Sequence, residues 1–301
     1  MPHSYLVIGG GGFLGRHVVE QIRARQDGST IAVFDIASPK EPDADITYHV
    51  GDLRKYDDVL QAMKGITAVI HTASPPHVNS SNPPRDLYFS INVDGTKNVI
   101  KACQEAGVPI LVVTSSGSVI STGEPMVNVD EHTPYPPLAI DVYTESKIGN
   151  NSSLMDFTYV GNIAYAHVLA AEKLALSTKS PVGGQAFNLT NGTPVPFWDF
   201  ASKVWYEYGK DMPKSKKIIL SYNASMVIAY ISETIYDIKA LFWDKATLKE
   251  GMTRSRIKQA MSSRYFNIDK ARTLLGYEPI VGLEEGIKIG VENYKINNPA
   301  T

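Results

Sequence analysis

The sequence lacks the features that mark disulfide-stabilised, nucleic-acid-binding and membrane-spanning proteins. Its single cysteine, Cys103, excludes an intrachain disulfide and fits a reducing compartment. The net charge of −2 offers no electrostatic reason for nucleic-acid binding. The apolar segment at residues 218–242 contains no uncharged run of the roughly 20 residues that a spanning helix needs. The remaining composition, with 43% hydrophobic and 20% charged residues, is ordinary for an α/β protein.

A glycine-rich turn separates a short apolar run from an amphipathic stretch near the N-terminus. Residues 5–8 predict a buried parallel strand, and residues 16–25 have the periodicity of a helix. The glycines between them follow the spacing G-x-x-G-x-x-G, at Gly9, Gly12 and Gly15. Such glycines permit a tight turn, the approach of a pyrophosphate to the backbone, and close packing of helix on strand. We therefore predict that a dinucleotide binds the amides at the helix N-terminus, which includes Phe13 and Leu14.

An acidic residue ends the next predicted strand. Residues 31–34 form an apolar run that leads to Asp35, twenty residues after Gly15. At this separation a carboxylate accepts hydrogen bonds from the adenosine ribose, although a solvated strand end is the alternative. Because a carboxylate repels a 2′-phosphate, Asp35 favours NAD as the cofactor, with NADP as the less favoured alternative.

Strands and helices alternate along the N-terminal part of the chain. Further apolar runs at residues 46–50, 68–71 and 110–113 predict three more strands. The alternation predicts an α/β fold, a Rossmann-type doubly wound parallel sheet, with a smaller C-terminal substrate-binding region. Asp52 and Leu53 follow the third strand, on the side where such sheets bind ligands. Asp52 could hydrogen-bond adenine or cap the next helix, and the sequence leaves both interpretations open.

Small and polar residues follow the fourth strand and interrupt the helix after it. Ala73 and Ser74 would let a dinucleotide cross the strand end. His71 has no catalytic partner placed for it, so packing is its expected role. Residues 87–106 predict a long helix, but Asn92 and other poor helix formers lie in its middle. Their presence indicates a packing or functional reason.

A tyrosine and a lysine share one face of a predicted helix. Tyr143 and Lys147 are four residues apart, so their side chains lie side by side. An ammonium group beside a phenol favours the phenolate and lowers the pKa of the tyrosine. A hydroxyl after the fifth strand can then hold the substrate oxygen; Ser116 is the candidate, and Ser115 and Ser118 are its rivals. We predict a catalytic pair that moves a proton while a nicotinamide moves a hydride, rather than a chance surface pair.

Together these motifs resemble those of the extended short-chain dehydrogenases/reductases. The likeness is carried by the glycine turn, Asp35, Asp52–Leu53, His71, Ala73, Asn92, Gly95, Thr96, Asn98, residues 114–116, Tyr143 and Lys147. Within the superfamily the chain looks most like the 3β-hydroxysteroid dehydrogenase branch, and especially like its decarboxylating sterol-4α-carboxylate 3-dehydrogenases. This closer likeness rests on residues 7–15, 33–36, 73–76, 114–120, 154–160, 196–198, 270–272 and 275–279. The resemblance also implies that Asn92, Tyr143 and Lys147 contact the cofactor.

The resemblance implies a reaction. It is the NAD-dependent oxidation of the 3β-hydroxyl of a 4α-carboxysterol to the 3-ketone, with loss of the carboxylate as CO2. Tyr143 would act as the base, Lys147 would lower its pKa and hold the nicotinamide ribose, and Ser116 would hydrogen-bond the substrate hydroxyl. Two alternatives stay open. One is another extended-family reductase or epimerase acting on a small ketone or sugar nucleotide, and the other is a non-catalytic dinucleotide sensor.

The resemblance further implies partners and a location. These are a sterol substrate, a homodimer, association with other enzymes of sterol C-4 demethylation, and peripheral attachment to the cytosolic face of the endoplasmic reticulum membrane. A cytoplasmic protein is the alternative. Residues 218–242 carry apolar side chains at helical spacing after Lys214, Lys216 and Lys217, which suits an interfacial helix on anionic lipid. A helix that caps the substrate-binding region would show the same spacing.

The chain departs from the family after Lys147. The family continues a helix there and then forms a strand, whereas residues 148–153 of this chain are unfavourable for a helix. We therefore expect a block of residues to be absent, one that contains a sheet strand and part of the wall around the nicotinamide and the substrate. The block is missing either from this sequence alone or from the molecule itself. Residues 1–147 are then the NAD-binding Rossmann domain, and residues 148–301 a mixed region with returning Rossmann elements and the substrate-binding part. In that region we expect helices at 162–176 and 197–208 and a strand at 186–189.

Overall fold

The fold is known from a computed structural model, which describes residues 3–75, 85–121, 124–134, 153–210, 222–242, 253–254 and 262–298. The chain divides into two compact units. The Rossmann unit consists of Met1–Ser115, Val160–Phe187 and Asp269–Ile280. The second unit consists of Ser116–Tyr159, Asn188–Ile268 and Val281–Thr301. The domain boundary that we expect after Lys147 lies outside the described residues.

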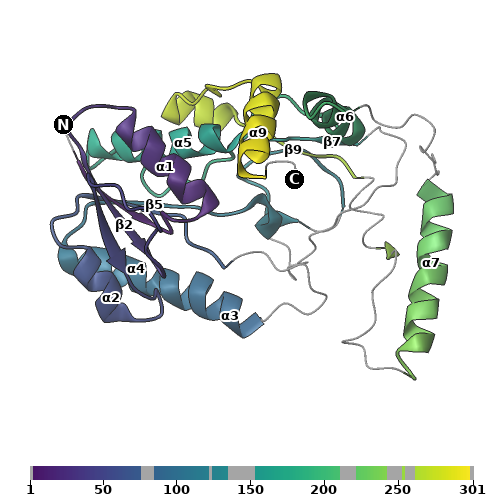
Figure 1. Ribbon diagram of the computed structural model, residues 1–301, viewed down its shortest axis with the longest axis horizontal. Coiled ribbons are helices and arrows are strands. Elements are labelled where there is room, and N and C mark those ends of the chain that lie inside the picture. Colours follow the sequence, from purple (N-terminus) through teal and green to yellow (C-terminus); the bar gives the residue numbers. More distant parts are fainter. Residues whose placement is uncertain are drawn as a thin grey trace. The chain divides into compact units, whose positions relative to one another are not determined.

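A parallel sheet forms the centre of the Rossmann unit. Its described strands lie in the order β3-β2-β1-β4-β5, and every neighbouring pair is parallel (Figure 1). They are β1 Ser4–Ile8, β2 Thr30–Asp35, β3 Ile46–Val50, β4 Ala68–His71 and β5 Ile110–Val113. A parallel sheet is covered on both faces, which is why β1 and β4 are almost continuous apolar runs. The five strands predicted from the sequence are confirmed.

Helices cover both faces of this sheet (Figure 1). On one face lie α1 Phe13–Arg23 and α5 Val160–Ala175; on the other lie α2 Tyr56–Ala62 and α4 Thr96–Ala106. Val18 and Val168 are fully buried in the first layer, and Val59 and Val99 in the second. Burying one such side chain stabilises a fold by roughly 1.5–3 kcal/mol. The predicted doubly wound α/β fold is therefore confirmed.

The long helix after β4 contains a π-helical turn. It runs through α3 Arg85–Phe89, the π-helical segment Ser90–Gly95 and then α4, in line with one another (Figure 1). At Gly95 an added Cβ would lie 3.0 Å from the Cβ of Leu53. Asn98 donates from Nδ2 to the carbonyl oxygen of Leu53 at 2.8 Å. The poor helix formers therefore serve packing against the loop after β3, and π-helical turns are frequent near functional sites.

The second unit contains a smaller mixed sheet. Its strands, β6 Met126–Val129, β7 Leu154–Met155, β8 Val195–Pro196 and β9 Arg264–Phe266, lie in the order β6-β9-β7-β8. β6 and β7 run parallel to β9, and β8 runs antiparallel to β7. The helices given by the described residues of this unit are α6 Phe197–Glu207, α7 Tyr222–Lys239 and α9 Leu283–Asn297. Two shorter turns complete the described structure, a 3-10 turn at Gly117–Ile120 and a π-helical turn of the Rossmann unit at Ala271–Leu275.

The helices expected at 162–176 and 197–208 are confirmed by α5 and α6, but the strand expected at 186–189 is wrong. A strand requires a neighbouring backbone with which to form a ladder. Each hydrogen bond of Asn188 instead involves one side chain. Its backbone N–H donates to the Glu131 carboxylate at 2.6 Å, and its side-chain Nδ2 donates to the Val129 carbonyl oxygen at 3.1 Å. These bonds take the place of a strand ladder.

Candidate functional site

The glycine-rich turn joins β1 to α1 at the carboxyl end of the sheet. Gly9 has a φ of +81°, in the left-handed region that favours glycine. A Cβ on Gly15 would lie 2.1 Å from the carbonyl oxygen of Gly9, and a Cβ on Gly9 would lie 2.7 Å from the backbone of Ala73. The turn is therefore too tight for side chains at these two positions.

The N-terminus of α1 is open to an anion. Gly12 is its N-cap and makes no side-chain capping hydrogen bond, and no acidic residue lies in the first turn. Gly12 and Phe13 are exposed, whereas Leu14 is half-buried against the core. Amides without a capping side chain, at the positive end of the helix dipole, attract phosphate groups.

Asp35 ends β2 beside this turn. Its Oδ2 accepts a hydrogen bond from the N–H of Gly11 at 2.9 Å, and its Oδ1 accepts one from the N–H of Ile36 at 2.7 Å. A carboxylate offers about four acceptor positions, so these bonds orient Asp35 and leave capacity for ribose hydroxyls. The structure thus brings Gly9, Gly15 and Asp35 together as the sequence predicts, and they fit a dinucleotide.

Asp52 is held by Arg54 in the loop after β3. The Arg54 side chain donates from Nε at 3.0 Å and from Nη2 at 2.5 Å, and its backbone N–H donates at 2.9 Å. This hydrogen bonding to Arg54 holds the pKa of Asp52 below its usual range. The N-cap of α2 is Lys55 and makes no side-chain capping bond, so the capping interpretation of Asp52 is wrong. Its contact with adenine stays a prediction, as does that of the adjacent buried Leu53.

The end of β4 borders the glycine turn. Thr72 donates through its hydroxyl to the carbonyl oxygen of Ile8 at 3.0 Å, and Ala73 lies against Gly9. His71 is buried, its Nε2 lies 3.0 Å from Thr96 Oγ1, and burial lowers its pKa to about 4. His71 is therefore a neutral packing residue, as expected. Ser74 is exposed just beyond the strand.

The serine-rich segment follows β5. Ser116 Oγ accepts a hydrogen bond from the N–H of Ser118 at 3.2 Å and lies 2.8 Å from Ser118 Oγ. Ser115 and Ser116 are both exposed. Asn92 is exposed within the π-helical segment Ser90–Gly95. Tyr143 and Lys147 lie outside the described residues, so their catalytic and cofactor roles stay predictions.

The sequence interpretation missed His167, which lies on α5. This side chain is only 5% exposed, and its Nε2 lies 2.8 Å from Thr114 Oγ1 at the end of β5. A histidine among the small apolar residues of a predicted helix was the one available signal. Pattern analysis could not connect it with a threonine so distant in the chain.

The described residues contain no cluster of three or more side chains suited to a metal ion.

Comparisons with known proteins agree with this geometry. The model of the 3-beta hydroxysteroid dehydrogenase/isomerase family matches residues 6–149 and 146–220. The chain is 36% identical to the decarboxylating sterol-4-alpha-carboxylate 3-dehydrogenase of Schizosaccharomyces pombe, over 96% of each protein. It is 32% identical to the human enzyme of the same name, over 96% of this chain and 87% of that protein. The fold is similar to that of a UDP-glucose 4-epimerase from Brucella ovis in complex with NAD, with a TM-score of 0.69, 17% identity, and coverage of 95% of this chain and 96% of that one.

The two stretches matched by the family model overlap at residues 146–149. The alignment with the Schizosaccharomyces pombe enzyme spans 344 positions, more than the 301 residues of this chain. Some residues of that enzyme therefore have no counterpart here.

Proposed function

Because the chain belongs to the 3-beta hydroxysteroid dehydrogenase/isomerase family, we propose that it oxidises the 3β-hydroxyl of sterols that carry a 4α-carboxylate. The similarity to decarboxylating sterol-4-alpha-carboxylate 3-dehydrogenases, which extends over 96% of this chain, carries the proposal. The proposed cofactor is NAD. The tight glycine turn, the uncapped N-terminus of α1 and the oriented Asp35 carboxylate support its binding.

The proposed residues divide the chemistry as follows. A bound nicotinamide supplies the acceptor for the hydride from C3. Ser116 holds the substrate oxygen, Tyr143 takes the hydroxyl proton, and Lys147 lowers the pKa of Tyr143. The product is a ketone β to the carboxylate. Such an acid loses CO2 readily because the electron pair of the broken bond is delocalised into an enolate, so no separate decarboxylating residue is needed.

The direct test is product analysis. The protein is incubated with NAD and a 4α-carboxy-3β-hydroxysterol, and the sterol 3-ketone, CO2 and NADH are measured together. We expect the three in equal amounts. Parallel incubations with a UDP-sugar and with a small ketone test the two other enzyme chemistries. NAD binding without turnover of any of these substrates would refute the proposed reaction and favour the dinucleotide sensor.

The cofactor proposal predicts the effect of changing Asp35. An amide at this position has no charge to repel a 2′-phosphate, so Asp35→Asn should reduce the preference for NAD over NADP by about tenfold or more. The amide oxygen retains one of the two backbone hydrogen bonds, so the melting temperature should change little. Binding of each cofactor, followed by protein fluorescence, measures the preference. A wild-type protein that prefers NADP would contradict the assignment of Asp35.

The family model matches the chain in two stretches that overlap at residues 146–149. This division supports a second part of the proposal, the absence of a family segment after Lys147. The segment would add a strand and part of the nicotinamide and substrate wall. Intact mass of the protein isolated from its native cells, compared with the mass of the 301-residue chain, decides whether the molecule itself lacks the segment.

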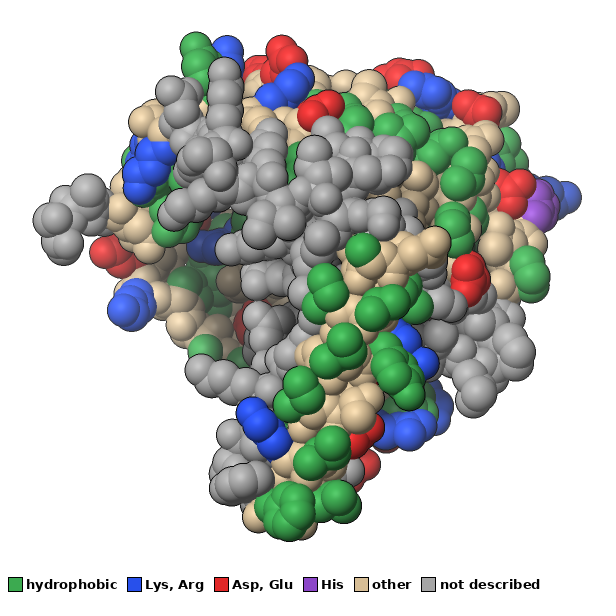
Figure 2. All heavy atoms as spheres, turned by 90° about the vertical axis from the view of Figure 1, so that its right-hand side faces the viewer, with side chains coloured by type: hydrophobic (Ala, Val, Ile, Leu, Met, Phe, Trp, Pro, Cys, Tyr) green, Lys and Arg blue, Asp and Glu red, His purple; other side chains and the backbone are tan. Residues whose placement is uncertain are grey.

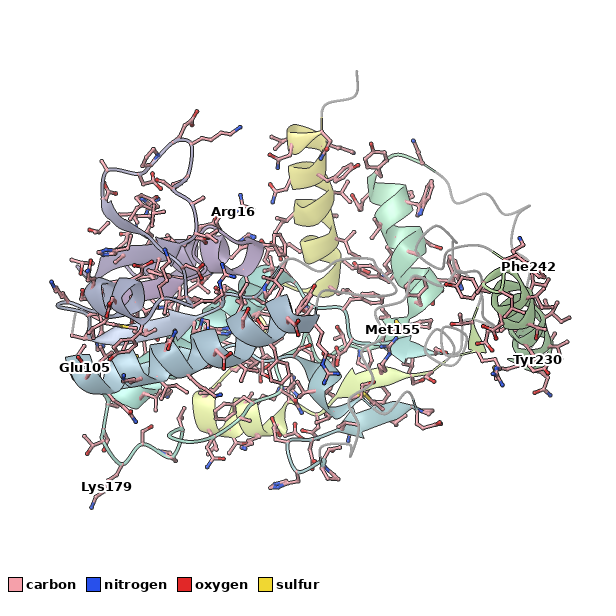
Figure 3. The ribbon with its side chains drawn as sticks, turned by 90° about the horizontal axis from the view of Figure 1, so that it is seen from below. Arg16, Glu105, Met155, Lys179, Tyr230 and Phe242 are labelled. Carbon is pink, nitrogen blue, oxygen red and sulfur yellow. The ribbon has the colours of Figure 1, made fainter. Side chains whose placement is uncertain are left out.

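We further propose that α7 attaches the protein to the cytosolic face of the endoplasmic reticulum. Val227, Ile231 and Ile238 of α7 are all more than half exposed and recur at helical spacing. At 100° per residue they fall opposite the buried Ser225 and Ala229. Figure 2 shows hydrophobic side chains gathered along α7, and Figure 3 shows Tyr230 projecting from it and Phe242 just beyond its C-terminal end. An apolar stripe along one exposed face of a helix suits an interfacial position. No described helix is long and apolar enough to cross a membrane.

Vesicle flotation tests the attachment. Liposomes with anionic lipid should carry the wild-type protein upward, and the triple change of Val227, Ile231 and Ile238 to serine should reduce the bound fraction by about tenfold or more. The matched control changes three exposed apolar residues outside α7, Leu176, Ile280 and Ile296, to serine and should float as the wild type does. Equal flotation of the two triple variants would refute the role of α7.

A further inference from the structure

A buried threonine–histidine hydrogen bond holds the end of β5 within the Rossmann unit. Thr114 follows the last residue of β5, and its N–H donates to the carbonyl oxygen of His71 at 2.9 Å. Its hydroxyl lies 2.8 Å from Nε2 of His167, on α5. Thr114 is thus fixed by its backbone to β4 and by its side chain to a helix that covers the sheet.

The hydrogen-bonding partners of His167 define its tautomer. Its Nδ1 lies 2.7 Å from the carbonyl oxygen of Ile163, which can only accept, so Nδ1 carries the proton. The Nε2 of a neutral ring is then an acceptor, and the Thr114 hydroxyl donates to it. Burial lowers the pKa of His167, which favours this neutral form. The bond therefore has one direction, and the hydroxyl of Thr114 is held in one orientation.

The chain immediately after Thr114 carries the proposed substrate-binding hydroxyl. Ser116 is two residues further on, and both Ser115 and Ser116 are exposed. Among the described residues, the side chain of Ser116 forms short-range bonds to Ser118, and these bonds do not tie the segment to the sheet. Thr114, two residues before Ser116, ties this segment to the sheet and to α5.

We propose that His167 is a positioning residue, which fixes Thr114 and thereby the path of the Ser115–Ser116 segment from the sheet. The consequence for catalysis rests on the proposed function, since it assumes that Ser116 holds the substrate oxygen. The consequence for local structure does not depend on that assumption. A catalytic hydroxyl displaced by about 1 Å can lose roughly a hundredfold in rate, so a distant anchor affects turnover.

Hydrogen exchange of the full chain tests the local consequence. Thr114→Val removes the hydroxyl at nearly constant volume, and the amides of residues 114–118 should then exchange about tenfold faster. Thr114→Ser keeps the hydroxyl and should exchange as the wild type does. The matched control is Thr30→Val, which removes a hydroxyl that donates to Ser4 Oγ at the amino end of the sheet and should leave exchange at 114–118 unchanged.

Turnover and cofactor binding test the catalytic consequence. With a 4α-carboxysterol and NAD, Thr114→Val should lower kcat by about tenfold or more while the Kd for NAD stays within about twofold. His167→Leu should lower kcat in the same way, and His167→Gln, whose amide oxygen can accept from Thr114, should recover much of that loss. These two His167 variants replace Thr114→Val in the test if Thr114→Val does not fold. Unchanged exchange at 114–118 in Thr114→Val, or an equal rise in Thr30→Val, would overturn the proposal. Faster exchange without any sterol turnover by the wild type would refute the proposed function and retain the anchor.

Discussion

Gly15→Ala is expected to abolish NAD binding and to lower the melting temperature by roughly 10 °C. The added Cβ would lie 2.1 Å from the carbonyl oxygen of Gly9 and 2.7 Å from the Cα of Gly10. These are backbone atoms, which cannot rotate away as the end of a flexible side chain can. The turn would have to open, and its opening would move the amides that are to bind the phosphates. Isothermal titration with NAD and thermal unfolding measure the two effects.

The matched control for this change is Gly290→Ala in α9. Apart from the backbone of α9 itself and the two neighbouring residues, no heavy atom of the described residues lies within 4 Å of a Cβ at Gly290. Alanine in a helix is more stable than glycine by roughly 0.5–1 kcal/mol. Gly290→Ala should therefore bind NAD normally and melt at an equal or higher temperature. A Gly15→Ala protein with wild-type affinity for NAD would show that the turn does not form the phosphate site.

The sheet and its first helices were predictable because their signals are local. A parallel strand buried on both faces needs a continuous apolar run, and the runs at 68–71 and 110–113 coincide with β4 and β5. The glycine spacing was equally informative, because the backbone around Gly9 and Gly15 leaves no room for a Cβ, so only glycine fits at these positions. The place of Asp35 beside the glycine turn was also predictable, because it depends on one fixed separation within a βαβ unit, and its contact with ribose stays a prediction.

The errors arose where a non-local partner decides the outcome. Residues 186–189 are mostly apolar, as in a strand, but Asn188 forms hydrogen bonds to Glu131 and Val129 in place of a strand ladder. His167 is a comparable case, since its bond to Thr114 joins residues that only the folded sheet and α5 bring together.

The poor helix formers after β4 were read correctly as needing a reason, and the structure supplies it. Gly95 leaves room for Leu53, and Asn98 binds the Leu53 carbonyl, so both hold the loop that contains the predicted adenine site. Low local helix propensity is here offset by packing between two βα connections. A sequence can reveal such a conflict but does not identify the segment that resolves it.

Tyr143→Phe is expected to reduce sterol turnover by about 10²–10⁴-fold while leaving NAD affinity within about threefold of the wild type. The phenylalanine ring keeps the volume and packing of tyrosine and removes only the group that accepts the substrate proton. Without that acceptor, the developing charge on the substrate oxygen is not relieved as the hydride departs. Steady-state kinetics with a 4α-carboxysterol and a separate titration with NAD give the two quantities.

Lys147→Ala is the comparison that separates the two roles of the pair. Lys147 is proposed both to lower the pKa of Tyr143 and to hold the nicotinamide ribose, so its loss should weaken NAD binding as well as turnover. In the wild type the pH profile of kcat should show a group that must be deprotonated, with a pKa below the 10 of an ordinary tyrosine. In Lys147→Ala this pKa should rise, because the neighbouring positive charge is gone. If Tyr143→Phe retained wild-type turnover, or if the profile of Lys147→Ala were unshifted, Tyr143 would not be the base.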